Sequence, residues 1–77
     1  MKTNDIKKGT RVQLRCGWYA TMYDNMKGNT RMAEVEGIYT ECGSVYAHDI
    51  VKAQKADGTW EKVEHTPAQL KMKAMGW

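Results

Sequence analysis

The chain of 77 residues has little cysteine and no long apolar segment. No apolar run approaches the roughly 20 residues that a helix needs to cross a bilayer, and residues 1–5 lack the apolar stretch of a signal peptide. Cys16 and Cys42 are too few for the disulfide framework of a small secreted fold. We therefore expect a cytoplasmic protein with reduced thiols, and the alternative is a bridge between Cys16 and Cys42 if their loops meet.

Sequence patterns typical of metal sites are also missing. There is no Cys-x-x-Cys and no closely spaced pair of histidines, so a zinc site made by Cys16, Cys42 and His48 with His65 or Asp49 is a minor alternative. We expect no cofactor. The two histidines and two thiols are more simply loop and surface residues.

Catalytic patterns are equally weak. Cys42, Ser44, His48 and Asp49 include a nucleophile and a base, but such a cluster of neighbours is more often a turn. Residues 27–30 have the residue types of a Walker loop without its spacing. A chain of this length buries only about 60% of its surface, which leaves little room for a catalytic cleft. The sequence predicts a single domain that is not an enzyme.

Charge is distributed unevenly along the chain. Residues 1–31 hold seven basic and two acidic residues, a net charge of +5, whereas residues 32–66 hold three basic and seven acidic residues, a net charge of −4. The tail from residue 67 adds two lysines and brings the total to +3. Such polarity favours a binding role for one or both halves.

Alternating polar and apolar residues predict five or six short strands between about residues 10 and 63, the pattern of a small barrel or sandwich. Turns are expected at residues 16–17, 41–44, 48–49 and 57–58, and a polar loop at residues 24–30. The expected inward-facing residues are Val12, Leu14, Trp18, Ala20, Met22, Ala33 and Val35. Trp18 and Trp60 are expected in the core, and Trp77 is expected either to fold back on the barrel or to join an interface.

At the end of the chain the spacing of the apolar residues changes from that of a strand to that of a helix, which predicts a short helix over about residues 67–75. Thr66 is a good N-cap, Pro67 suits the first helical position, and Gly76 ends the helix. Leu70 and Ala74 are four residues apart, and Met72 and Met75 are three apart, so one side of this helix is expected to cover an open end of the barrel.

The stretch from Lys8 to Leu14, followed by Gly17-Trp18 and residues 20–22, resembles the opening of KOW-type domains. Ala20 stands where that motif has its second glycine. The resemblance implies an SH3-like barrel and the ribosomal or transcriptional partners such domains often have. The later run at residues 36–51 resembles small bacteriophage proteins and implies no activity. The predicted fold is therefore mainly β: one small SH3-like barrel of five or six short strands with a short C-terminal helix.

Two binding hypotheses follow. A protein partner is favoured, because the charge is polarised and Met32 and Ile38 are predicted to face outward. The chain would then be a phage-type accessory adaptor in the host cytoplasm, with self-association through its two halves as one version. The alternative is an RNA- or DNA-binding module. For either partner the candidate residues form a basic and aromatic face: Lys7, Lys8, Arg11, Arg15, Tyr19, Tyr23, Lys27 and Arg31.

Overall fold

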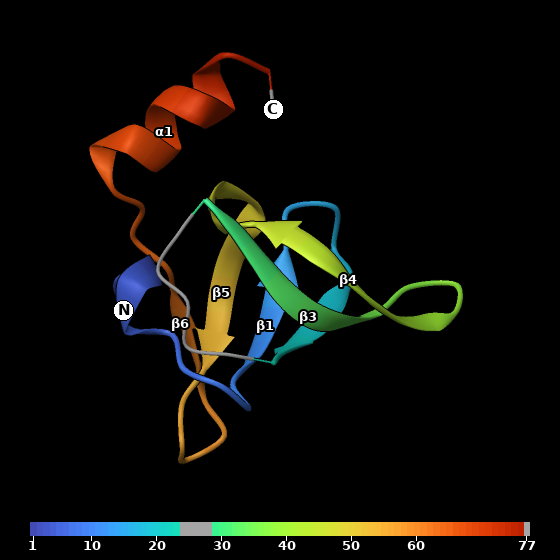
Figure 1. Ribbon diagram of the computed structural model, residues 1–77. Coiled ribbons are helices and arrows are strands. Elements are labelled where there is room, and N and C mark those ends of the chain that lie inside the picture. Colours follow the sequence, from blue (N-terminus) through green and yellow to red (C-terminus); the bar gives the residue numbers. More distant parts are fainter. Residues whose placement is uncertain (24–28, 77) are drawn as a thin grey trace.

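The computed structural model describes residues 1–23 and 29–76, and its main feature is one antiparallel sheet of six strands (Figure 1). The strands follow the order β4-β3-β2-β1-β5-β6 in the sheet. Short 3₁₀ turns, η1 at Thr3–Asp5 and η2 at Ala47–Asp49, and the helix α1 at Pro67–Ala74 complete the chain. The strands are β1 Arg11–Leu14, β2 Tyr19–Met22, β3 Thr30–Glu36, β4 Thr40–Tyr46, β5 Ile50–Gln54 and β6 Trp60–Lys62.

The core lies inside the curl of this sheet. Figure 1 shows the hairpin of β3 and β4 crossing over β1 and β5, so that the inner faces of the strands turn toward one another. Alternate side chains of β1 and β2 point inward, as predicted, because successive side chains of a strand face opposite sides. The buried apolar residues are Ile6, Val12, Leu14, Ala20, Met22, Ala33, Val45, Ile50, Ala53 and Val63.

The two edges of the sheet differ. Beside β6, Glu64 N–H donates to the Met1 carbonyl (2.8 Å) and Thr3 N–H donates to the Glu64 carbonyl (2.9 Å), so the N-terminal segment runs along this edge. Strand β4 is the other edge, and within residues 1–23 and 29–76 it pairs only with β3. The mainly β fold with a C-terminal helix is confirmed, and the sheet is curled rather than closed by hydrogen bonds between β4 and β6.

Helix α1 begins as the sequence predicts. The Thr66 hydroxyl accepts a hydrogen bond from Gln69 N–H (3.2 Å), and the Gln69 side chain accepts one from Thr66 N–H (3.0 Å), which makes a capping box. The helix packs against η2 with Gln69 buried and Met72 half-buried. The expectation for Leu70 is wrong, because its side chain is 51% exposed.

One predicted turn is also wrong. Residues 41–44 have the composition of a turn but lie within β4, where Cys42 pairs with Glu34 and Gly43 with Ala33. The chain reverses instead at residues 37–39, between β3 and β4. Seven consecutive residue pairs hold this hairpin, and that tertiary pairing overrides the weak strand propensity of glycine and serine.

Candidate functional site

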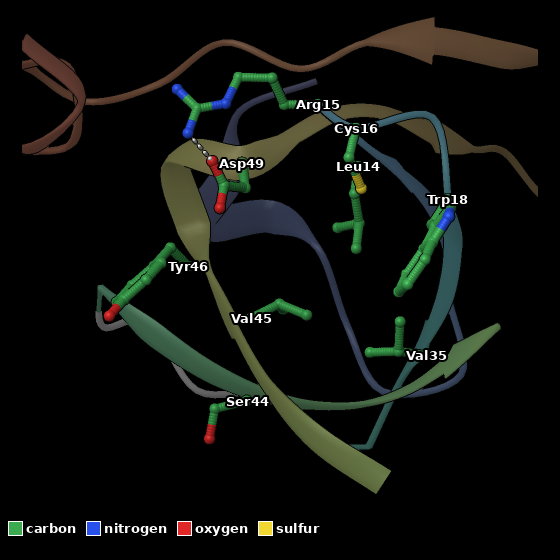
Figure 2. Close-up of a pocket in the computed structure, with 9 residues that line it drawn as sticks. All are labelled: Leu14, Arg15, Cys16, Trp18, Val35, Ser44, Val45, Tyr46 and Asp49. Atoms are coloured by element: carbon green, nitrogen blue, oxygen red, sulfur yellow. Dashed lines mark ion pairs between the residues drawn. The ribbon is translucent and has the colours of Figure 1, made fainter. Parts of the chain in front are cut away.

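An apolar cavity of about 360 Å³ opens at one end of the curled sheet. Figure 2 shows Leu14, Trp18, Val35 and Val45 pointing toward this hollow from four different parts of the chain, while the Ser44 hydroxyl points away from it. Leu14 and Val45 belong to the core, so the cavity is a place where the core reaches solvent. An opening of this kind can take up one apolar side chain of another molecule.

Trp18 forms one wall of the cavity rather than part of the core. It precedes β2, is 46% exposed, and lies so close to Gly37 that a Cβ atom there would overlap its ring carbons. Glycine at position 37 therefore permits the indole to lie flat against the β3–β4 connection. The prediction that Trp18 and Trp60 are core residues is wrong, because both are exposed on the surface.

The tip of the β3–β4 hairpin continues the apolar surface. A second hollow of about 220 Å³ shares Trp18 and Val35 with the cavity and adds Ile38, Tyr39 and Glu41. Ile38 is 83% exposed and Tyr39 is 75% exposed, which is unusual for two adjacent large apolar residues. We define the apolar docking surface as Trp18, Val35, Ile38, Tyr39, Val45 and Tyr46.

The charged rim of the cavity is one ion pair. The Arg15 guanidinium lies 2.9 Å from a carboxylate oxygen of Asp49, and both residues line the cavity (Figure 2). Behind them His48 is fully buried and stacks on Tyr46, with ring centroids 5.1 Å apart. The predicted bend at residues 48–49 is thus confirmed as η2, and it carries part of the cavity rim.

The predicted basic and aromatic face is only partly assembled. Arg31 is 1% exposed, and its guanidinium donates to the Thr3 carbonyl (2.7 Å) and to Asn4 Oδ1 (2.9 Å). Its placement on an exposed face is therefore wrong. Arg31 shares the inward side of β3 with Ala33 and Val35, and its side chain anchors η1 to the sheet. Lys27 lies outside the described residues.

The other predicted residues divide between two places. Arg11 makes a two-pronged contact with Glu36 (3.2 Å for each hydrogen bond) and lies 4.8 Å from the centre of the Tyr19 ring, whereas Arg15 is at the cavity rim. Both arginines thus pair with carboxylates of the acidic half of the same chain. The Tyr23 hydroxyl and the Cys42 thiol share a 3.0 Å hydrogen bond, which raises the pKa of Tyr23 to about 12.

A second exposed face, which the sequence indicated only in part, surrounds Tyr19. The Tyr19 and Trp60 rings lie 5.5 Å apart. Next to Arg11 is a polar hollow of about 370 Å³ that Lys8 and Lys55 also line. Lys7 is exposed nearby in sequence. This grouping, Lys8, Arg11, Tyr19, Lys55 and Trp60, is the cationic aromatic face.

The residues considered for catalysis or metal binding do not converge. The Ser44 hydroxyl donates to Met32 Sδ (3.5 Å) and the Cys42 thiol contacts Tyr23, while His48 is buried. Cys16 and Cys42 are free thiols. In the described part of the chain, no three His, Cys, Asp or Glu side chains are grouped closely enough to hold a metal ion. Within the same residues, no helix has the length and apolar character to cross a membrane.

Comparison with protein-family models, with curated proteins and with solved structures finds no match to this chain.

Proposed function

We propose that this chain is a non-enzymatic binding module, an accessory adaptor of the bacteriophage type, that docks on a protein partner through the apolar docking surface. The observation that carries this proposal is the open cavity of about 360 Å³ walled by Leu14, Trp18, Val35 and Val45. A small domain gains nothing in stability from leaving core residues open to water, so a surface of this kind fits a binding role.

The chemistry of the walls indicates which partner fits. The cavity is apolar inside, so it suits an aliphatic or aromatic side chain of the partner. Glu41 lines the adjoining hollow and is exposed, whereas Arg15 at the opposite rim pairs with Asp49. A lysine or arginine beside the inserted side chain would meet Glu41. We therefore infer an extended partner segment with an apolar anchor and a basic neighbour.

Trp18 supplies the main contact energy in this proposal. Large aromatic side chains at the centre of an interface typically lose about 2 kcal/mol or more of binding free energy when truncated. That loss corresponds to a dissociation constant about 30-fold higher. The neighbouring residues would chiefly exclude water from around the indole.

The test is a selection of extended peptides from a random displayed library, followed by fluorescence anisotropy with the selected sequences. We expect an apolar anchor flanked by a basic residue, and binding that weakens at least about 10-fold in Trp18→Ala. Trp60→Ala is the matched control, because it removes another exposed indole, 37% against 46% for Trp18, from a different face. Equal affinity of Trp18→Ala and the unsubstituted protein would overturn the proposal.

A second candidate function is binding of single-stranded nucleic acid at the cationic aromatic face. The specific observation is that the polar hollow with Lys8, Arg11 and Lys55 lies next to the adjacent Tyr19 and Trp60 rings. Lysines can neutralise phosphates and aromatic rings can stack on bases. Arg11 contributes less net charge because Glu36 partly neutralises it.

Anisotropy with labelled 12-residue DNA and RNA strands tests this candidate at low and near-physiological salt. Binding that falls steeply with salt and is lost in Lys55→Glu and Trp60→Ala, but not in Trp18→Ala, would support it. Absence of binding at low salt would remove it and leave the protein partner as the single proposal.

A further inference from the structure

Among residues 1–23 and 29–76, no strand lies beside the outer edge of β4. The opposite edge, at β6, is covered by the N-terminal segment, whereas β4 pairs only with β3 among the described residues. Soluble proteins commonly protect an edge with charged side chains, proline or a bulge. Strand β4 has one charged residue, Glu41, and no lysine, proline or bulge: its sequence is Thr-Glu-Cys-Gly-Ser-Val-Tyr, and its register with β3 is continuous over seven residue pairs.

The two ends of the β3–β4 hairpin show which N–H and C=O groups of β4 face β3 and which face away from it. Ala47 N–H donates to the Asn29 carbonyl (2.8 Å), and Gly37 N–H donates to the Tyr39 carbonyl (3.2 Å). Hydrogen-bonded pairs alternate in an antiparallel ladder, so the odd-numbered residues of β4 bond to β3. The N–H and C=O groups of Thr40, Cys42 and Ser44 therefore face outward, away from the sheet.

We infer that β4 pairs with β4 of a second copy of this chain, in antiparallel register about a two-fold axis at Gly43. This inference goes beyond the proposed function, because it concerns the backbone edge of β4 and the Ile38 and Tyr39 end of the apolar docking surface, not the side chain that enters the cavity beside Trp18. In this register Cys42 of each copy lies opposite Ser44 of the other, and their outward backbone groups bond to one another.

Two features of the chain favour a second copy over another strand. The exposed tip with Ile38 and Tyr39 lies at one end of β4, and Tyr46, at the rim of the cavity, lies at the other end. A two-fold axis at the middle of β4 exchanges these ends. Residues 38–39 of each copy then lie beside residues 47–48 of the other. Ala47 and His48 are themselves fully buried, so the exposed side chain next to the apolar tip is Tyr46 at the cavity rim.

The charges on β4 permit this pairing. Glu41 is the only charged residue of the strand, and in this register it lies opposite Val45. The two Glu41 residues are separated by four positions along the paired strands, roughly 14 Å at 3.4 Å for each residue. Backbone bonds and apolar contacts hold the pair, so its affinity should change little with salt, unlike a pairing of the basic and acidic halves.

The test is sedimentation equilibrium over protein concentrations from about 10 μM to about 1 mM, at two salt concentrations. We expect the apparent mass to rise from 8.8 kDa toward twice that value with little dependence on salt. Two variants test the register. Cys42→Lys/Ser44→Lys places like charges opposite each other in the pair, whereas Cys42→Lys/Ser44→Glu places opposite charges there.

The two variants change the contacts inside the monomer at position 42 in the same way, because both put lysine opposite Glu34 and both remove the Cys42 thiol from Tyr23. We expect the first to raise the dissociation constant about tenfold and the second to restore pairing. A monomer at every concentration, or equal association of both variants, would overturn the inference. Peptide binding at Trp18 by a strictly monomeric chain would overturn this inference alone and leave the proposed function standing.

Discussion

Replacing Arg31 with alanine should destabilise the fold more than any other substitution of a basic residue of the candidate face. The guanidinium is buried and donates to the Thr3 carbonyl (2.7 Å) and to Asn4 Oδ1 (2.9 Å). Each hydrogen bond from a charged group contributes about 1.5–3 kcal/mol, whereas the Thr3 carbonyl keeps the bond that it accepts from Ile6 N–H (3.2 Å). Loss of the two Arg31 bonds therefore gives a loss of about 3–6 kcal/mol, out of the roughly 4–12 kcal/mol expected for 77 residues.

Urea denaturation followed by circular dichroism measures this loss. With a slope of about 1 kcal/mol per molar urea, the midpoint should fall by about 3 M or more. If the total stability is at the low end of that range, the variant will be unfolded even without urea. Arg11→Ala is the control, because its exposed ion pair with Glu36 contributes about 0–1 kcal/mol. Similar midpoints for the two variants would refute the structural role of Arg31.

Three further substitutions test local features of the chain. Gly37→Ala should displace the Trp18 ring, seen as a change in tryptophan fluorescence and as weaker binding of selected peptides. Thr66→Ala should cost about 0.5–2 kcal/mol in urea denaturation, because it removes the helix cap. The Thr59 hydroxyl and N–H hold the pKa of Asp57 below the ordinary value of an aspartate, so stability from ionised Asp57 is present at neutral pH and is lost as pH falls through this lowered pKa. Thr59→Val should raise that pKa in a carboxyl NMR titration, and an unchanged titration would contradict the assignment.

The strands were predictable where the side-chain pattern and the turns agreed. Val12 and Leu14 alternate with polar residues in β1, and Gly58, at the Asp57-Gly58 turn, has a positive φ of 89°. The prediction of a turn at residues 41–44 was wrong. Their composition is typical of a turn, but in the fold these residues pair with β3 and form part of β4. Pairing with β3 decides their conformation, and a single sequence does not contain that information directly.

The candidate site was harder to predict than the fold. Arg31 is two residues from Ala33 and four from Val35, so the same alternation that placed those residues inward also indicated a buried Arg31. Its charge led to the opposite prediction, because arginine is rarely buried without partners. The cavity joins Leu14, Trp18, Val35 and Val45 from separate segments, and only the fold brings them together.

The most direct test of the central proposal is an amide ¹H–¹⁵N NMR titration of the labelled protein with a selected peptide. We expect the largest shifts at residues 14–18, at Val35 and at residues 45–49, which surround the cavity, with little change around Lys55 and Trp60. Shifts confined to the cationic aromatic face, with the cavity amides unmoved, would contradict the account.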